Sequence, residues 1–314
     1  MFNYTIDNKR YHTLNYHFKK TFGKKVYKAV IDAGFTCPNI DGRVSSGGCG
    51  YCLSGSGEFT NDPRFSVTEQ LKKEYERISK KHENPELIAY FQAHTNTYAP
   101  IDVLRKKYEE ALSFSSVVGL SIATRPDCID EKIADLLEEF SKKTCLTVEL
   151  GLQTVNDDVA KSFNRGYTYD TFLYAYKLLK ERGIRVCIHI INGLLGETKE
   201  DMINTAKKVG QLHPDAVKIH LLHILKGTKY EREYNENKLV PLKKDEYIDI
   251  VVRQLEVLPQ KTVIERITGD GSKRNLIAPK WSLDKISVLG AIDKEMAHRN
   301  TYQGIFLLDE MCDL

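Results

Sequence analysis

The chain has 314 residues, of which 41% are hydrophobic and 28% are charged, so it can bury a full core as a soluble globular protein. It contains no run of about eighteen apolar residues, and its polar, basic N-terminus does not resemble a secretory signal; both observations exclude a membrane span and favour the cytoplasm. The 46 basic and 43 acidic residues leave a net charge of +3, which neither requires nor excludes a nucleic-acid partner.

The first thirty residues are rich in basic side chains, with aromatic side chains between them. We expect this segment, residues 1–30, to pack on the rest of the fold; a solvated face is the common explanation of such a charge run. The basic residues are Lys9, Arg10, Lys19, Lys20, Lys24, Lys25 and Lys28, and the aromatic ones are Tyr11, Tyr16, Phe18, Phe22 and Tyr27.

Six apolar, β-branched runs alternate with amphipathic stretches of helical spacing. This alternation predicts parallel strands joined by right-handed crossovers, and its period of about thirty residues favours a barrel. We therefore predict an α/β fold with a partial (β/α)6 barrel of the TIM type over residues 31–260, followed by a short C-terminal extension over residues 261–314. The expected strands lie at 26–31, 87–93, 117–123, 145–152, 185–195 and 216–224.

The loop after the first strand carries three of the seven cysteines, Cys37, Cys49 and Cys52. Eleven residues separate the first pair and two separate the second, and glycines between them allow the chain to wrap closely around a bulky group. Soft thiolates select zinc, copper(I) or iron–sulfur clusters. Three ligands leave one iron of a cubane cluster open to a cosubstrate, so the loop favours such a cluster.

The main alternative for this loop is a structural zinc site. Such a site needs four protein ligands, so His12, His17 or Cys128 would have to supply the fourth. The odd number and uneven spacing of the cysteines argue against a disulfide framework. We expect the cysteines outside the loop to be small buried apolar residues without a role. They are Cys128, Cys145, Cys187 and Cys312.

The aromatic residue Tyr51 directly precedes the last cysteine of the loop. This peptide resembles the cluster loop of the radical-SAM superfamily, and the long first gap is similar to that of the elongator catalytic subunit and its bacterial relatives. The resemblance covers about residues 4–300 and implies a small bacterial family without the acetyltransferase domain of elongator. It also implies a 4Fe-4S cluster held by the three cysteines, with S-adenosyl-L-methionine (SAM) as cosubstrate.

The segment 148–168 resembles a peptide shared by the elongator subunit and oxygen-independent coproporphyrinogen oxidase. The resemblance places Gln153 near the ribose of SAM and Arg165 on its carboxylate, which a guanidinium binds through two parallel hydrogen bonds. Without the family, Arg165 would be read as a surface charge. Glu149 alternates with apolar neighbours on the same strand. It is either a polar ligand for SAM or substrate or half of a buried salt bridge.

Two further strand ends resemble the parts of the family that support adenosine. Gly193 lies in a glycine-bearing turn after the fifth strand, where backbone can approach a ligand and where Glu197 or Thr198 opens the next helix. His220 lies on the sixth strand, whose backbone contacts adenine in related proteins. It is either close to the site or a satisfied core histidine.

The second and third strands end in polar segments. Gln92 and Asn96 belong to a hydrogen-bonding segment that corresponds to the position where the family binds the amino group of SAM. Arg125 and Asp127 either face the cavity or form an ion pair that braces the loop. The catalytic candidates are therefore Glu149, Gln92 and Arg125, and the cofactor-binding candidates are Gln153, Arg165, Gly193, Asn96 and His220.

The resemblance implies an enzyme that reductively cleaves SAM to a 5'-deoxyadenosyl radical. It further implies a tRNA substrate, in which the C5 substituent of the wobble uridine is altered, for example from carboxymethylaminomethyl to aminomethyl. Flavodoxin or ferredoxin would donate the electron, and residues 1–30 would contact tRNA. The alternatives are a radical-SAM enzyme acting on a small molecule such as a porphyrin, and a non-catalytic zinc-binding or RNA-binding scaffold.

Overall fold

The computed structural model describes residues 2, 4–5, 7–53, 60–269 and 273–307. The chain forms two compact units, each assembled from segments that are distant in sequence. Unit 1 contains Met1–His17, Leu152–Phe163 and Ile188–Leu314, and unit 2 contains Phe18–Gly151 and Asn164–Cys187. Cys312 lies outside the described residues. In the described part of the chain, no helix is both long enough and apolar enough to cross a lipid bilayer.

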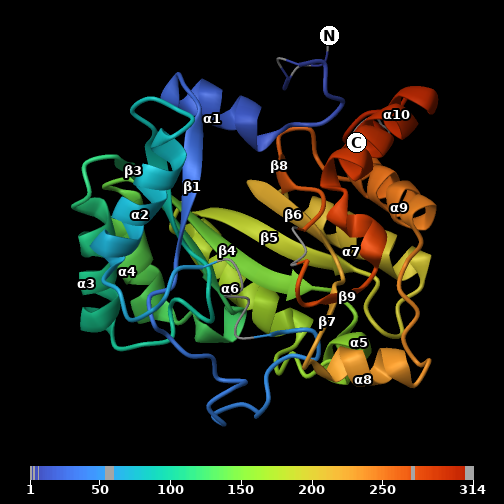
Figure 1. The fold of residues 1–314 in the computed structure, drawn as a ribbon, viewed down its shortest axis with the longest axis horizontal. Coiled ribbons are helices and arrows are strands. Elements are labelled where there is room, and N and C mark those ends of the chain that lie inside the picture. The colour runs from blue at the N-terminus through green and yellow to red at the C-terminus, as the bar shows by residue number, and fades with distance from the viewer. Residues whose placement is uncertain (1, 3, 6, 54–59, 270–272, 308–314) are drawn as a thin grey trace. The chain divides into compact units, whose positions relative to one another are not determined.

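Seven strands form one sheet in the order β1-β2-β3-β4-β5-β6-β8 (Figure 1). The first six follow one another in chain order with a helix after each, as right-handed β-α-β crossovers require. This topology confirms the α/β class and the partial TIM-type barrel. The strands are β1 (Val26–Ile31), β2 (Glu86–Phe91), β3 (Val117–Thr124), β4 (Cys145–Gln153), β5 (Arg185–Asn192), β6 (Ala216–Leu221) and β8 (Val263–Arg266).

Most helices begin at a residue whose side chain accepts a hydrogen bond from the first turn, as Ser66 does from the amide of Glu69. The helices are α1 (Leu14–Phe22), α2 (Val67–Ser79), α3 (Ile101–Leu112), α4 (Glu131–Ser141), α5 (Asp157–Ser162), α6 (Tyr169–Glu181), α7 (Lys199–Gln211), α8 (Lys229–Asn235), α9 (Lys244–Glu256) and α10 (Lys285–His298). Short 3-10 turns lie at Pro126–Cys128, Lys280–Leu283 and Ile305–Leu307.

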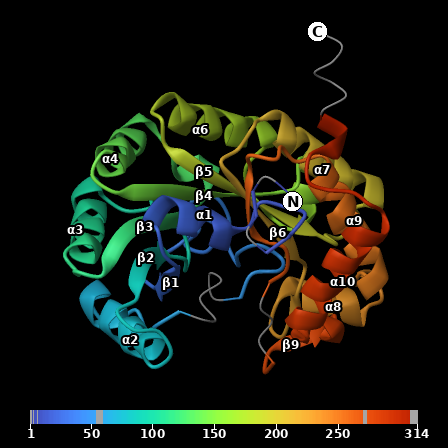
Figure 2. The ribbon, with the colours of Figure 1, turned by 90° about the horizontal axis from the view of Figure 1, so that it is seen from above.

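In unit 2, strands β1 to β4 are parallel, and helices α2, α3 and α4 cover one of their faces (Figure 2). A chain of three buried rings joins the layers. Phe91 of β2 meets Tyr108 of α3 edge-on at 5.4 Å between ring centroids, and Tyr108 meets Phe140 of α4 in the same way at 5.4 Å. Edge-to-face packing adds roughly 0.5–1.5 kcal/mol per pair to the burial of the rings.

In unit 1, β8 pairs in parallel with β6, and the two-residue β7 (Ile224–Leu225) pairs antiparallel with β9 (Leu276–Ala278). Strand β8, which lies after position 260 in the sequence, therefore extends the sheet. The fully buried Gln254 of α9 fastens the end of β5 to two helices, because its amide exchanges hydrogen bonds with Asn192 and donates to the carbonyl of Met202. A fully satisfied buried amide orients these elements without an unpaired polar group.

Part of the basic N-terminal segment serves packing. Tyr11 and Phe18 are buried, so these aromatic side chains do not face solvent. Lys19 and Lys20, in the last turn of α1, are exposed. In this segment the lysines of α1 therefore carry exposed charge, while neighbouring aromatic side chains are buried in the fold.

Candidate functional site

The cysteine loop follows β1 in unit 2 and folds back on itself through backbone hydrogen bonds. The amide of Ile40 donates to the carbonyl of Cys37 at 2.8 Å, and the amide of Cys52 donates to the carbonyl of Cys49 at 2.9 Å. Asp41 also forms an isolated antiparallel bridge with Ser46. As whole residues, the three cysteines are partly exposed. The loop is thus a preformed turn that presents three sulfur donors.

Asn39 is completely buried and links Cys49 to the segment that follows α5. Its amide nitrogen donates to the sulfur of Cys49 at 3.5 Å and to the carbonyls of Asn164 and Arg165 at 2.5 and 3.1 Å. The amide of Asn164 donates in turn to the carbonyl of Gly48 at 3.0 Å. Hydrogen bonds to a ligating sulfur tune the reduction potential of an iron–sulfur cluster. Sequence reasoning missed both asparagines, because no motif marks them.

The donor set of the loop fits an iron–sulfur cluster. The pKa of the Cys49 thiol is raised to about 12, mainly by burial and also by the sulfurs of Cys52 and Cys37, while Arg125 and the hydrogen bond from Asn39 act to lower it. A thiolate there needs strong positive charge beside it, which bound iron supplies. In a cubane cluster each thiolate binds an iron of its own, so three cysteines are a sufficient protein donor set.

Gly166 lets the segment after α5 approach the cysteine loop. Its φ is +84°, and an added Cβ would lie 2.7 Å from Cγ1 of Val44 and 2.8 Å from Oδ1 of Asn39. We expect Gly166→Ala to displace the loop, to cost about 1–3 kcal/mol of stability and to lower the iron bound per chain at least about twofold. Iron and sulfide assays after anaerobic reconstitution measure the second effect.

The matched control for this prediction is Gly183→Ala. Gly183 also has a positive φ, +68°, but an added Cβ would meet nothing within 4 Å. It therefore introduces the same kind of backbone strain without touching the loop. Equal iron loss in both variants would show that strain alone, and not the close approach to Asn39, explains the result.

Arg165 is 1% exposed, so it is not a surface charge. Its Nε donates to the carbonyl of Tyr167 at 2.9 Å, and its guanidinium carbon lies 4.7 Å from the centre of the Tyr167 ring. The guanidinium of Arg125 also faces that ring, at 4.9 Å. Arg125 forms two hydrogen bonds with Asp127, of 2.9 and 2.7 Å, so the bracing ion pair exists. Two guanidinium groups thus gather around one tyrosine in unit 2.

Glu149 is fully buried on β4 and is one half of a salt bridge, with its Oε1 2.7 Å from Nζ of Lys28 on β1. The hydroxyl of Tyr90 donates to its other oxygen at 2.9 Å, and Ser121 donates to Oε1. Glu149 is therefore half of a buried salt bridge, and its role toward SAM or substrate stays a prediction. In the sequence, its partner Lys28 belongs to the basic N-terminal segment.

Asn96 is fully buried after β2. Its amide nitrogen donates to the carbonyls of Phe91, Ala93 and Ala123 at 2.9–3.2 Å, which fixes the side chain between the ends of β2 and β3. Its Oδ1 is buried and has no hydrogen-bond partner among the described residues. An acceptor of this kind suits an ammonium group. The backbone amide of Gln92, directly after β2, donates to the carbonyl of Ile31, the last residue of β1.

Three candidates belong to unit 1. Gln153 ends β4 with a φ of +63°, a left-handed conformation that non-glycine residues rarely adopt and that is common at functional sites. The amide of Gly193 donates to the sulfur of Met202 at 3.2 Å. The His220 ring lies 5.0 Å from that of His189 on β5.

Thr198 is the residue that opens α7, because its hydroxyl accepts from the amide of Asp201 in a capping box. Glu197 instead buries both carboxylate oxygens. That burial raises its pKa from 4.5 to about 8, although a hydrogen bond from Thr154 lowers it in part. Because the native state holds a proton that the unfolded chain releases, this group's contribution to stability is greatest below pH 4.5 and falls as pH rises to about 8.

We therefore expect the stability of the wild type to decrease relative to Glu197→Gln between about pH 5 and pH 8, by the order of 2–4 kcal/mol. Thermal unfolding at several pH values measures the difference. Glu200→Gln, on the exposed first turn of α7, is the control and is expected to run parallel to the wild type. Parallel curves for Glu197→Gln and the wild type would disprove the raised pKa.

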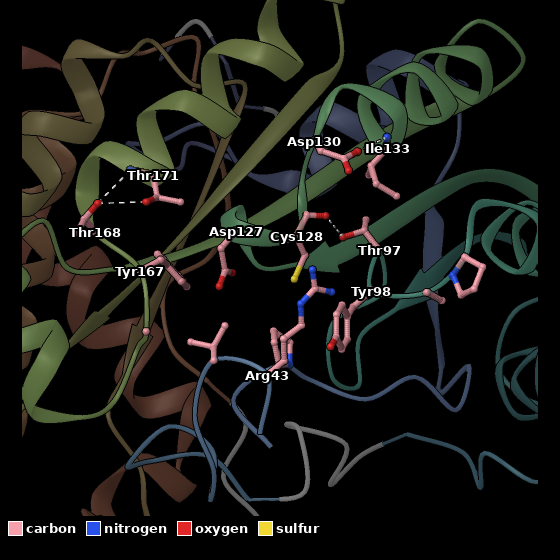
Figure 3. A pocket seen from close by; sticks show the side chains of 15 residues that line it. Arg43, Thr97, Tyr98, Asp127, Cys128, Asp130, Ile133, Tyr167, Thr168 and Thr171 are labelled. Atoms are coloured by element: carbon pink, nitrogen blue, oxygen red, sulfur yellow. Dashed lines mark hydrogen bonds between the residues drawn. The ribbon is translucent and has the colours of Figure 1, made fainter. Parts of the chain in front are cut away.

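A pocket of about 910 Å³ lies beside the cysteine loop within unit 2. It is lined by the loop, by the segments after β2 and β3, and by the start of α6. Figure 3 shows the guanidinium of Arg43 beside the Tyr98 ring, with the sulfur of Cys128 facing the same space. The guanidinium carbon of Arg43 lies 5.4 Å from the centre of that ring. Thr168 and Thr171 add hydroxyl groups on the other wall.

Two family models match this chain. The Radical SAM superfamily matches residues 40–209, and the Radical_SAM C-terminal domain matches residues 214–298. The chain belongs to the radical SAM superfamily. Members of this superfamily use a 4Fe-4S cluster together with SAM, so the chain is a radical SAM enzyme with these cofactors. The predicted relation to this superfamily is confirmed, and the assignment of the cluster to the cysteine loop stays a prediction.

Relatives of this radical SAM enzyme extend to proteins of tRNA modification. The uncharacterised protein YtqA of Bacillus subtilis is 47% identical over 97% of this chain and 95% of its own length. The tRNA uridine(34) acetyltransferase of Methanocaldococcus jannaschii is 29% identical over 49% of this chain, which is 28% of that protein. The structure of Methanocaldococcus infernus Elp3 shares the fold, with a TM-score of 0.69 at 19% identity over 88% of this chain and 64% of that one. The predicted relation to elongator is thereby confirmed.

Proposed function

We propose that this radical SAM enzyme modifies tRNA, at the C5 substituent of the wobble uridine, converting carboxymethylaminomethyl-uridine to aminomethyl-uridine. One observation carries the proposal: about half of the chain is similar to a tRNA uridine(34) acetyltransferase. By its name, that relative acts on uridine 34, the wobble nucleotide. A small-molecule substrate and a zinc or RNA-binding scaffold remain as outcomes of the test described below.

The proposal assigns the cluster to Cys37, Cys49 and Cys52. The guanidinium of Arg165, which packs against Tyr167, would bind the carboxylate of SAM through two hydrogen bonds. The buried Oδ1 of Asn96 would accept a hydrogen bond from the amino group of SAM.

The proposal assigns Gln153 to the ribose of SAM, Gly193 and His220 to its adenosine, and Gln92, Arg125 and Glu149 to the substrate. It also assigns the basic segment 1–30 to contact with tRNA.

When bound, the cluster and SAM supply a 5'-deoxyadenosyl radical that removes a hydrogen atom from the substrate. The chain supplies the surroundings. The N–H of Asn39 at the sulfur of Cys49 stabilises negative charge there and so shifts the reduction potential of the site. The ion pair of Arg125 with Asp127 holds the neighbouring loop in one conformation. Flavodoxin or ferredoxin delivers the electron, and the cytosol provides the reducing conditions that free thiols require.

The pocket beside the cysteine loop suits a tRNA base that is splayed out of the anticodon. Tyr98 offers a half-buried ring for stacking, and the exposed Arg43 offers a cation for phosphate. We expect Tyr98→Ala to weaken the binding of an anticodon stem-loop about fivefold, at the low end of the roughly 1–3 kcal/mol for stacking on one base. Tyr98→Phe should bind normally, because it keeps the ring.

Fluorescence anisotropy under anaerobic conditions measures this affinity. The control is Tyr174→Ala, which removes a 56% exposed tyrosine of α6 that does not line the pocket. Equal affinities for Tyr98→Ala and Tyr174→Ala would mean that the pocket does not contact the stem-loop.

The decisive experiment uses anaerobically reconstituted enzyme, a chemical reductant, SAM and an anticodon stem-loop with carboxymethylaminomethyl-uridine at the wobble position. Mass spectrometry follows 5'-deoxyadenosine and the modified nucleoside. The proposal expects both 5'-deoxyadenosine and aminomethyl-uridine. Formation of 5'-deoxyadenosine with an unchanged nucleoside would contradict the tRNA substrate and favour a small molecule. A colourless protein that contains zinc and cleaves no SAM would favour the scaffold.

A further inference from the structure

Four polar side chains meet on one face of strands β1 to β4 in unit 2. The strand register places Tyr90 of β2 opposite Ser121 of β3, and Glu149 of β4 lies two residues beyond the partner of Ser121. Lys28 of β1 reaches the same point from the other side. The opposite face of β2 carries Phe91, which packs on helix α3. The polar group therefore lies on the face that these helices do not cover.

The energetics of this group call for an explanation. The Glu149 side chain is 0% exposed and the Lys28 side chain is 17% exposed. The ammonium of Lys28 also lies 4.8 Å from the centre of the Tyr90 ring. Burying two charges costs more free energy than their attraction commonly returns, so well-packed apolar side chains would serve stability at least as well. Lys28 is the partly exposed member of the ion pair.

We propose that Lys28 and Glu149 together bind a zwitterionic group of the substrate, with its carboxylate on Lys28 and its ammonium on Glu149. The inference rests on the tRNA substrate proposed above, whose carboxymethylaminomethyl substituent carries a secondary ammonium and a carboxylate. Binding exchanges one ion pair for two. A substituent with a single charge leaves Lys28 or Glu149 buried without a counter-charge, so the site rejects it.

The same pairing accounts for the release of product. Aminomethyl-uridine keeps the ammonium and has no carboxylate, so Lys28 loses its new partner and returns to Glu149. Tyr90 and Ser121 keep the carboxylate of Glu149 in place through the exchange, because both donate hydrogen bonds to it. Lys28 and Glu149 are thus specificity-determining residues for the substituent.

The test measures binding of two anticodon stem-loops to anaerobic holoenzyme with SAM and without reductant, so that no turnover occurs. One stem-loop carries carboxymethylaminomethyl-uridine, and the other carries its primary amide, which has the same shape without the negative charge. We expect the wild type to prefer the acid by at least about tenfold, as a charge-assisted contact provides. Lys28→Met should bring this ratio to about one, because it removes the proposed partner of the carboxylate.

Two further variants separate a loss of the carboxylate contact from other effects of the substitution. Lys28→Met leaves Glu149 buried without its cation, so the double variant Lys28→Met/Glu149→Gln, which buries no charge, is measured alongside and should also show a ratio of about one. Lys24→Met removes a lysine of β1's N-terminal flank that pairs with Glu86 at 2.8 Å and is 54% exposed. It should keep the ratio of the wild type.

Each outcome decides the inference. A wild-type ratio near one, or an unchanged preference for the acid in both Lys28 variants, would overturn it, while formation of aminomethyl-uridine under reducing conditions would leave the proposed function standing. If the wild type bound neither stem-loop and formed no aminomethyl-uridine, the proposed function would fail and the inference with it. If the wild type and Lys24→Met prefer the acid and only the two Lys28 variants lose this preference, both the inference and the proposed function are supported.

Discussion

Cys49→Ala is expected to abolish reductive cleavage of SAM, with the yield of 5'-deoxyadenosine at least about a thousandfold below the wild type, because catalysis depends on a group that this cysteine ligates. Asn39 donates to the sulfur of Cys49, and the backbone amide of Cys52 donates to its carbonyl. Cys37→Ala and Cys52→Ala should behave alike, because a cubane held by two thiolates is incomplete. Iron and sulfide content, the visible absorption of the cluster, and 5'-deoxyadenosine by mass spectrometry measure the effect.

Cys128→Ser and Cys145→Ser are the controls, and both should retain cluster and cleavage. Cys128 is the more informative, since it lies in the pocket beside the loop and would be the fourth ligand of a zinc knot. Loss of bound metal in Cys128→Ser together with Cys49→Ala would favour a four-cysteine zinc site. Normal SAM cleavage by Cys49→Ala would refute the assignment of the cluster.

The second large effect is expected at Arg165, where Arg165→Lys should weaken SAM binding about 10–150-fold, which corresponds to the roughly 1.5–3 kcal/mol of a hydrogen bond to a charged group. Lysine keeps the positive charge but cannot form two parallel hydrogen bonds with a carboxylate. It also loses the planar contact with the Tyr167 ring. Anaerobic equilibrium dialysis with the cluster-loaded enzyme measures the dissociation constant.

A structural role of Arg165 has to be separated from a role in SAM binding. Arg105→Lys is the matched control, because Arg105 makes a two-pronged ion pair with Glu139, with both contacts at 2.7 Å, on the surface of the same unit. It should lower neither the Tm nor the SAM affinity measurably. An Arg165→Lys enzyme with a lowered Tm and unchanged SAM affinity would show that this arginine only braces Tyr167 and the loop.

The sequence by itself determined the order of strands and helices, because both depend on local patterns. The apolar runs from Val26 to Ile31 and from Val117 to Ala123 coincide with β1 and with all but the last residue of β3. The resemblance of the cysteine loop and of segment 148–168 to known peptides likewise indicated the superfamily, and the family model confirms it. The sequence did not show that strand β8, after position 260, belongs to the sheet, because this depends on its pairing with β6.

Only the tertiary structure decided how the polar side chains pair. Asn39 meets Asn164 across 125 positions of sequence, and Lys28 meets Glu149 across 121. No local periodicity encodes such contacts, because they arise when parallel strands and their loops are brought together by long crossovers. For the same reason Arg165, an ordinary surface charge by residue type, is buried beside Tyr167. The cofactors could therefore be predicted from one loop, whereas the proposed surroundings of the substrate form only when the chain folds.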